Sequence, residues 1–176
     1  ARQEGRSDPT GMSEPGDEGP YHWLTVEAAY PETAEAYHFV LSPEPEDREH
    51  FSYAPGQFLS FRIPHADGTI LRSYSLSSAP DTDRDMTVCV KRVAGGRGSN
   101  WMNENLRGGG RIAASRPAGR FTLRDSNAPL LVIAGGSGIT PCLSLIKQAL
   151  FATDRSVRLV YANRDAASVI YKAELA

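Results

Sequence analysis

Short apolar runs, separated by turn residues, fill the chain between residues 22 and 115. Six of these runs span five to eight residues and are rich in β-branched and aromatic side chains, which favour strands: WLTVEA (23–28), AYHFVLS (36–42), QFLSFRIP (57–64), TILRSYSL (69–76), MTVCVKRV (86–93) and RIAAS (111–115). Turn residues separate several of them, at positions 55–56, 66–68 and 80–81. Six strands without long helices between them predict a small antiparallel barrel.

The pattern changes after the sixth run. Gly119, Phe121 and residues 125–127 indicate a final barrel strand that runs into a linker. The runs PLLVIA (129–134) and VRLVYA (157–162) are typical of covered strands, the first apolar at every position as expected for a strand buried on both faces. Between them, apolar residues recur at helical spacing and predict a helix packed on the sheet: Cys142, Leu145, Ile146, Ala149 and Leu150.

This strand–helix–strand order predicts the start of an α/β Rossmann-like nucleotide-binding domain. Residues 168–175 suggest the beginning of another helix. Open α/β sheets use about five or six strands, so we expect the domain to continue beyond residue 176. Residues 1–20 contain few apolar side chains and many Gly, Pro and acidic residues, which predicts a disordered tail. The expected organisation is therefore a tail (1–20), a barrel domain (21–127) and part of a nucleotide-binding domain (128–176).

Composition narrows the function classes. The chain is 40% hydrophobic and 23% charged with a net charge of −2, which argues against a nucleic-acid-binding surface. Its longest apolar run, residues 129–134, is too short for a membrane span. We therefore expect a protein without a membrane segment, and the two lone cysteines favour a cytoplasmic location. Cys89 and Cys142 are expected to be buried apolar residues, and the four histidines are scattered without metal-ligand spacing.

The stretch LRSYSLSS (71–78) is the first candidate for chemistry. Arg72 and Tyr74 are two residues apart on a predicted strand, so they leave the same face, whereas Ser75 points to the other. A guanidinium binds phosphate oxygens, an aromatic ring stacks on a flat heterocycle and a hydroxyl bonds to a ring heteroatom. The stretch therefore predicts a site for a planar, phosphorylated ligand. The alternative is an edge strand that is merely rich in Ser and Tyr.

Two glycine-rich turns follow. In VAGGRGSNWMNENL (93–106), Ser99 is the expected N-cap of a short helix. In GGSGITP (135–141), Thr140 is the expected N-cap and Pro141 the first helical residue. A helix start behind glycines presents free backbone N–H groups, which bind phosphate. The alternative for each is an ordinary strand-to-helix turn.

The order of these motifs resembles the ferredoxin–NADP reductase superfamily over about residues 21–176. YAPGQF (53–58), KRVAGGRGSNWM (91–102) and YANRDAASVIY (161–171) are most similar to its oxygenase-reductase branch, which includes ketosteroid 9α-hydroxylase reductases and the phenylacetyl-CoA epoxidase reductase subunit. The resemblance implies a barrel that binds FAD and a domain that binds NADH or NADPH. It also implies a C-terminal plant-type [2Fe–2S] domain, whose cysteines are absent from this sequence.

The resemblance also implies roles for individual residues. In the flavin-binding stretch 72–75, which includes Ser73, Arg72 would pair with the flavin phosphate, Tyr74 would stack on the isoalloxazine and Ser75 would bond near its N5 atom. Lys91, Gly98 and Ser99 match the second motif, with the amides of residues 98 and 99 on the pyrophosphate. Ser75 and Thr140 are the expected catalytic residues, and no metal ligand is expected. The residues that match the NAD(P)H site are Gly135, Gly136, Gly138, Thr140, Arg164 and Asp165.

The implied reaction is hydride transfer from NAD(P)H to FAD, followed by release of single electrons to a [2Fe–2S] centre that feeds an oxygenase or another acceptor protein. Coenzyme choice stays open, because Arg164 could hold a 2′-phosphate whereas Asp165 could hold the 2′-hydroxyl. One alternative is a flavin- or nucleotide-binding electron-transfer subunit without turnover. Another is the reductase half of a flavohaemoglobin-like nitric oxide dioxygenase. A barrel without cofactor, and FMN in place of FAD, are further alternatives.

Overall fold

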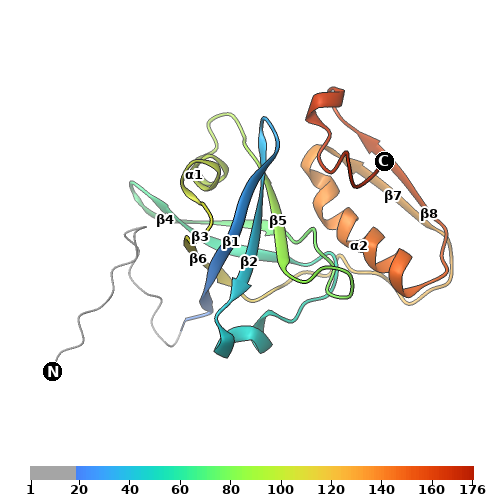
Figure 1. Cartoon of the computed structure of the whole chain (residues 1–176), viewed down its shortest axis with the longest axis horizontal. Coiled ribbons are helices and arrows are strands. Elements are labelled where there is room, and N and C mark those ends of the chain that lie inside the picture. Colours follow the sequence, from blue (N-terminus) through green and yellow to red (C-terminus); the bar gives the residue numbers. More distant parts are fainter. Residues whose placement is uncertain (1–18) are drawn as a thin grey trace.

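The computed structural model describes residues 19–176, and its larger part is a closed antiparallel barrel (Figure 1). Six strands form one sheet in the order β4-β3-β6-β1-β2-β5. An isolated bridge between Leu76 and Val88 joins the end of β4 to β5 and so connects the two edges. The strands are β1 (Tyr21–Thr33), β2 (Ala36–Pro43), β3 (Phe58–His65), β4 (Gly68–Ser75), β5 (Met86–Lys91) and β6 (Arg111–Ser115). The predicted six-stranded barrel is confirmed, while the predicted tail lies almost wholly outside the described residues.

Alternation of side chains along the strands fills the barrel. On β3, Leu59, Phe61 and Ile63 are completely buried, while the residues between them are partly exposed. Because successive strand residues point to opposite faces, one face of each strand supplies the core. The other buried members of this core come from the remaining strands except β4, from η1 and α1, and from the residues that directly follow β4 and α1: Leu24, Val26, Phe39, Leu41, Phe51, Leu76, Met86, Val88, Val90, Met102, Leu106, Ile112 and Ala114.

Two helical segments interrupt the barrel strands. A 3₁₀ helix, η1 (Pro45–Phe51), follows β2, and α1 (Arg97–Asn105) lies between β5 and β6. The expected N-cap of α1 was wrong, because Gly96 is the N-cap and Ser99 is the third helical residue. The Ser99 hydroxyl instead accepts a hydrogen bond from the N–H of Val93 at 3.2 Å. It ties the start of the helix to the loop that leads into it.

The C-terminal part is a two-stranded parallel sheet with one helix on it (Figure 1). Its elements are β7 (Leu130–Gly135), η2 (Gly136–Gly138), α2 (Ile139–Ala152), β8 (Val157–Ala162) and η3 (Ala166–Ser168). Val132 and Ala134 of β7 are buried, whereas Leu131 and Ile133 are 61% and 72% exposed. The strand is therefore covered on one face only, not on both as its sequence suggested. The end of the predicted stripe on α2, Leu150, is also exposed.

Three further expectations about local structure were wrong. Helix α2 has Gly138 as its N-cap, so Thr140 and Pro141 lie within its first turn. Within residues 119–129 the structure has no strand; the only pairing nearby is an isolated bridge between Phe58 and Ala118. Residues 168–175 form no α-helix, because η3 ends at Ser168 and Tyr171 has a φ of +62°. A positive φ at a non-glycine residue is incompatible with a right-handed helix.

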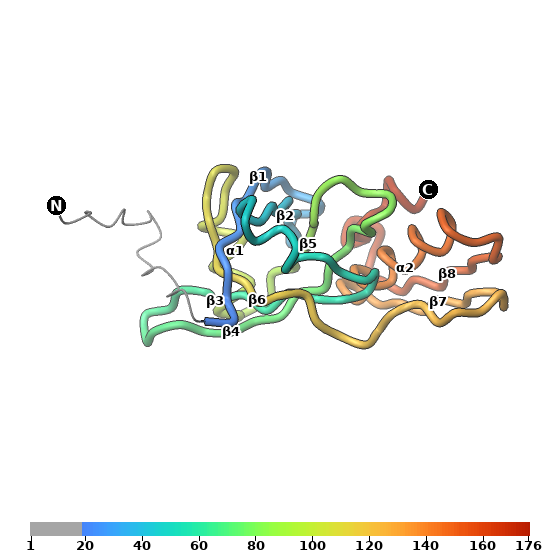
Figure 2. Tube along the Cα trace, turned by 90° about the horizontal axis from the view of Figure 1, so that it is seen from below, coloured from blue at the N-terminus to red at the C-terminus, as the bar shows by residue number. Residues whose placement is uncertain are grey.

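The barrel and the C-terminal part lie side by side in both views (Figures 1 and 2), and buried side chains of the two parts pack together. Ala36 and Cys89 of the barrel belong to the same buried cluster as Ile139, Ile170 and Tyr171 of the C-terminal part. Cys89 and Cys142 are buried and free, as expected. None of the helices in residues 19–176 has the length and apolar content needed to cross a bilayer.

Hydrogen bonds reinforce this shared surface. The buried hydroxyl of Ser144 on α2 donates to the carbonyl of Ser78 at 2.6 Å and accepts from the N–H of Gly56 at 3.2 Å. The ammonium of Lys147, one turn further along α2, lies 3.0 Å from the carboxylate of Asp83. These contacts fix α2 against the loops at the end of the barrel.

Candidate functional site

A cleft of about 580 Å³ lies where the barrel edge meets the start of α2. It collects segments far apart in the sequence, from β4, from the end of β5, from the glycine-rich loop before α1 and from the first turn of α2. It therefore brings together most of the residues that the sequence singled out. Its lining is Arg72, Ser73, Tyr74, Ser75, Cys89, Lys91, Val93, Gly95, Gly96, Arg97, Gly98, Ser99, Ser137, Gly138, Thr140 and Pro141.

Strand β4 lines the cleft with four consecutive residues, Arg72–Ser75, so both of its faces contribute. Tyr74 lies opposite Leu59 and Arg72 opposite Phe61 in the β3–β4 register, so both share the face that carries the barrel core. The rings of Tyr74 and Phe61 are 6.0 Å apart. Burial raises the pKa of Tyr74, although the nearby Arg72 guanidinium opposes this shift, so its phenol stays neutral. This supported aromatic ring suits stacking against a flat heterocycle.

The first turn of α1 approaches β4 very closely at Gly98. A Cβ added there would lie 2.8 Å from Cγ of Arg72 and 3.1 Å from Cδ1 of Ile63, so only glycine allows this approach without movement. The first N–H groups of a helix lack intrahelical acceptors. In α1 these groups belong to residues 97–99, and Gly98 and Ser99 line the cleft. The start of α1 thus presents free amide donors beside the Arg72 side chain.

Three cationic residues line the same cleft as these amides. Arg72 and Lys91 were expected, whereas Arg97 was missed. The signal for Arg97 was present, since it stands between the two glycines of the GRG sequence at 96–98. Lys91 is also 3.6 Å from the carboxylate of Glu35. Guanidinium, ammonium and helix N–H groups are the donors that bind phosphate oxygens, so the residues present fit a dinucleotide pyrophosphate.

The second glycine turn contributes only in part. Gly138 and Thr140 line the cleft, and the Thr140 hydroxyl donates to the carbonyl of Ser137 at 3.0 Å. Gly135 and Gly136 are not among the lining residues. Gly136 has a φ of +49°, and its carbonyl accepts a hydrogen bond from Tyr161 at 2.9 Å. These two glycines therefore shape the turn that presents the start of α2.

Arg164 and Asp165 lie outside the cleft. Gly135 pairs with Ala162 in the parallel β7–β8 register, so the residues after β8 emerge at the same sheet edge as the glycine turn. Arg164 forms an ion pair with Glu35 at 2.8 Å. Hydrogen bonds from the amide and hydroxyl of Ser168 lower the pKa of Asp165, whose carboxylate caps η3.

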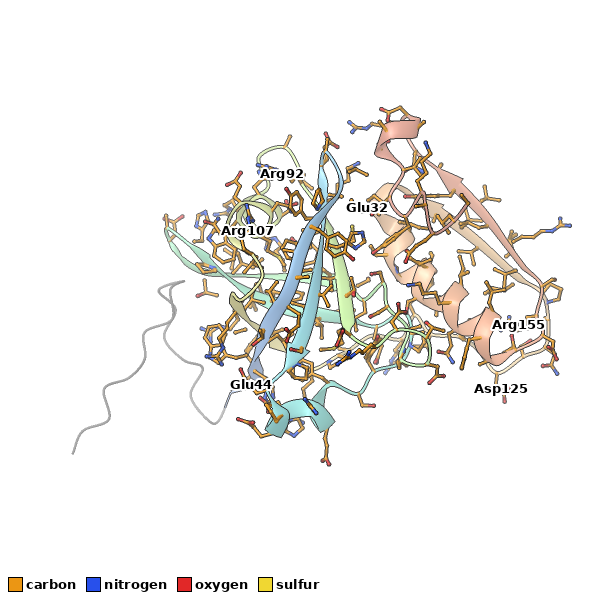
Figure 3. The ribbon with its side chains drawn as sticks, viewed as in Figure 1. Glu32, Glu44, Arg92, Arg107, Asp125 and Arg155 are labelled. Atoms are coloured by element: carbon orange, nitrogen blue, oxygen red, sulfur yellow. The ribbon has the colours of Figure 1, made fainter. Side chains whose placement is uncertain are left out.

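A larger hollow of about 710 Å³ contains none of the predicted site residues. It lies between the linker at residues 123–127 and the end of α2, near the labelled Asp125 and Arg155 (Figure 3). The carboxyl and guanidinium groups there form no glycine-supported donor set. We therefore assign the candidate site to the smaller cleft.

Two histidines that the sequence did not connect converge on one carboxylate. Nδ1 of His22 is 2.7 Å and Nδ1 of His50 is 3.3 Å from Oδ1 of Asp47. However, Nε2 of His22 faces the donor Nε of Arg116 at 3.5 Å. A metal-bound imidazole instead donates its second N–H to an acceptor. We interpret the cluster as a set of hydrogen bonds that holds η1 against the start of β1.

Comparison with known proteins agrees with the cleft. The family described as Oxidoreductase FAD-binding domain matches residues 27–123, which is more than half of the chain. The chain belongs to the oxidoreductase FAD-binding domain family. The Oxidoreductase NAD-binding domain family matches residues 132–176 of this FAD-binding chain. The resemblance to ferredoxin reductase-type proteins is therefore confirmed.

Several relatives of this chain are reductase components, and others are flavohemoproteins. The 3-ketosteroid-9-alpha-monooxygenase ferredoxin reductase component of Rhodococcus rhodochrous is 45% identical over 153 residues, which are 86% of this chain and 44% of that protein. A flavohemoprotein of Pseudomonas aeruginosa is 36% identical over 133 residues, 76% of this chain and 33% of that protein. Among solved structures, phthalate dioxygenase reductase matches with a TM-score of 0.78 and 27% identity, covering 88% of this chain and 47% of that one. The chain thus spans less than half the length of these relatives.

Proposed function

We propose that this chain is the flavin- and coenzyme-binding part of an NAD(P)H-dependent reductase that supplies electrons to an oxygenase component or another acceptor protein. The observation that carries the proposal is the single cleft that joins Arg72–Ser75, the glycine loop before α1 and the start of α2. The reductase relatives support it, since proteins similar over this region include oxygenase reductase components.

The residues of β4 and α1 would hold FAD. Arg72 and Lys91 supply positive charge for its phosphates, and the amides of Gly98 and Ser99 supply directed donors. Tyr74 offers its ring, which lies 6.0 Å from the ring of Phe61. Ser75, at the end of β4, would place its hydroxyl beside the reacting edge of the flavin and is the proposed catalytic residue.

The start of α2 would hold the coenzyme. Its first-turn amides and the Gly138 backbone suit the NAD(P)H pyrophosphate, and Thr140 fixes the turn through Ser137. Bound FAD would supply the redox chemistry, since it accepts a hydride and releases electrons one at a time. The protein's contribution is to hold two flat rings in one cleft and to exclude water from their contact.

The proposal extends to the parent protein. We infer a [2Fe–2S] domain outside this sequence as the first electron acceptor. The similarity to phthalate dioxygenase reductase supports this inference, because that protein is a modular structure for electron transfer from pyridine nucleotides to [2Fe–2S]. We also infer a cytoplasmic location. The two free thiols among the described residues, at Cys89 and Cys142, support a reducing compartment.

The direct test is the visible spectrum of the chain after incubation with FAD and desalting, followed by anaerobic addition of NADH or NADPH. We expect a retained flavin band that bleaches with one coenzyme, and loss of the band in Arg72→Ala. A matched control is Arg124→Ala, which removes an exposed arginine of the linker. A folded protein that retains no flavin would overturn the proposal. A retained flavin that neither coenzyme reduces would favour an electron-transfer subunit without turnover.

A second candidate is the reductase half of a flavohaemoglobin-like nitric oxide dioxygenase. The 36% identity to a flavohemoprotein over 133 residues favours it. The acceptor discriminates between the two. Electron transfer from the reduced chain to a ferredoxin-type [2Fe–2S] protein, but not to a globin haem, supports the oxygenase system.

A further inference from the structure

The tip of the β1–β2 hairpin reaches from the barrel to the segment that follows β8. The backbone carbonyl of Glu35 accepts from the N–H of Arg92 at 2.7 Å, and Ala36 pairs with Lys91, so the tip is held against the end of β5. From this position the Glu35 carboxylate contacts Arg164 at 2.8 Å and Lys91 at 3.6 Å. One carboxylate of the barrel thus touches a cation of each proposed ligand site.

A second contact keeps this segment in place. The N–H of Tyr171 donates to the carboxylate of Glu32, which also lies 2.7 Å from Nε2 of His38. Figure 3 shows Glu32 on the side of the hairpin that faces the C-terminal segment. Tyr171 is buried in the cluster that also contains Ala36 and Cys89. The chain after β8 is therefore fixed at both ends of residues 164–171, beside the hairpin tip.

The charges here bear on coenzyme choice. In open α/β sheets, the residues after the second strand lie next to the adenine ribose, where a 2′-phosphate distinguishes NADPH from NADH. The cation there, Arg164, already pairs with Glu35, and Asp165 adds a second carboxylate. A 2′-phosphate dianion would have to displace Glu35 and then remain close to two like charges. A 2′-hydroxyl meets neither penalty.

We propose that Glu35 is a specificity-determining residue, which disfavours a 2′-phosphorylated coenzyme by pairing with Arg164 across the two parts of the chain. The assignment rests on the proposed function, because it requires the adenine ribose to lie at the end of β8. It adds a residue of the flavin-binding barrel to the coenzyme site. The pair is largely exposed, with side-chain exposures of 68% and 48%, so its effect is moderate and depends on salt.

Binding of two probes to the full chain, with FAD present, tests the assignment at low ionic strength. The probes are adenosine 2′,5′-bisphosphate and adenosine 5′-monophosphate, and calorimetric titration gives both affinities. We expect Glu35→Gln to raise the affinity for the bisphosphate by about 3- to 10-fold, the size of one moderately screened charge, and to leave the monophosphate unchanged. The gain should shrink at high salt.

Two further variants sharpen the result. Glu35→Gln combined with Arg164→Gln should lose the gain, because the released cation is then absent. Glu104→Gln, which removes an exposed carboxylate paired with Arg92, should leave both affinities unchanged. If both probes bind and Glu35→Gln does not alter their ratio, the role of Glu35 is wrong while the coenzyme site stands. If neither probe binds, the coenzyme site itself is wrong, and the proposed function fails with it.

Discussion

Gly98 and Arg72 are in such close contact that a Cβ on the glycine would stand 2.8 Å from Cγ of the arginine. We expect Gly98→Ala to displace the Arg72 side chain, and to cost about 1–3 kcal/mol of unfolding free energy as overpacking does. Flavin affinity should fall as well, by about 10-fold or more for the loss of a charge-assisted phosphate contact. Urea unfolding and flavin fluorescence titration measure the two effects.

A double-mutant cycle separates this contact from a general effect on the loop. In the Arg72→Ala background the Cγ atom is gone, so adding Gly98→Ala should cost less than it does alone. Gly138→Ala is the matched control for stability, because a Cβ there meets nothing within 4 Å. If Gly98→Ala lowers the free energy of unfolding equally in both backgrounds, Arg72 is not the residue that prevents a side chain at position 98.

Ser144 links α2 to the barrel through two backbone groups. Removing its hydroxyl in Ser144→Ala leaves the carbonyl of Ser78 and the N–H of Gly56 without this partner in a buried site. Each unpaired buried group costs about 1–3 kcal/mol, so we expect a loss of at least this size in the free energy of unfolding. Ser156→Ala, at an exposed serine, should change stability by less than about 0.5 kcal/mol. Similar values for both variants would contradict the role of Ser144.

The Asp83–Lys147 ion pair should make the contact between α2 and the barrel sensitive to acid. Partial burial of Asp83 acts to raise its pKa, but hydrogen bonds from the Ala79 amide, Lys147 and Thr82 outweigh it and lower the pKa below 3.8. A carboxyl with a lowered folded-state pKa stabilises the fold fully above its unfolded value. That stability is lost as the pH falls through 3.8 towards the folded value.

We therefore expect Asp83→Asn to be less stable than the parent near neutral pH, by about 1 kcal/mol. The difference should shrink as the pH falls below 3.8. Thermal unfolding at a series of pH values gives this difference, with the exposed Asp154→Asn as control. A difference that stays constant down to pH 3 or grows on acidification would be inconsistent with the pair.

Cys89 lines the cleft yet should be inert. Burial raises the pKa of its thiol to about 12, and the Glu32 carboxylate adds to the shift. Because only the thiolate is nucleophilic, iodoacetamide near neutral pH should label the folded protein slowly and the denatured protein quickly. Mass spectrometry of the labelled peptides identifies the site. Rapid labelling of Cys89 in the folded chain would show that the cleft exposes it.

The alternation of apolar and polar residues predicted the barrel well, because it shows which face of each strand is buried. Helix starts were predicted less well. Ser99 and Thr140 are good capping residues, but the helices begin earlier, at Arg97 and Ile139. Their hydroxyls instead form hydrogen bonds with backbone groups that precede the helices. The apolar run at residues 129–134 wrongly predicted a strand buried on both faces. An apolar residue favours burial, but the sequence of a strand does not show whether the chain covers both of its faces.

The cleft was predictable in parts rather than as a whole. Several lining residues belong to sequence motifs whose chemistry suits phosphate or ring binding, and the fold brings them together: Arg72, Tyr74, Lys91, Gly98 and Thr140. The role proposed for Glu35 had no such signal. It depends on the register that places Ala36 beside Lys91 and on a contact 129 residues along the chain. Long-range contacts of this kind depend on tertiary packing, so no periodicity in the sequence predicts them.

The shared cluster of Ala36, Cys89, Ile170 and Tyr171 means that the two parts are not exchangeable modules. Transplanting this barrel onto another coenzyme domain would expose apolar surface at the hairpin and at β5, and the recipient would need matching side chains. Chimeras joined near residue 128 should therefore fold poorly unless the new C-terminal part carries apolar side chains that fit the hairpin and β5. Changing the coenzyme that this fold uses therefore means redesigning the apolar contact between the two parts as well as the coenzyme-binding residues.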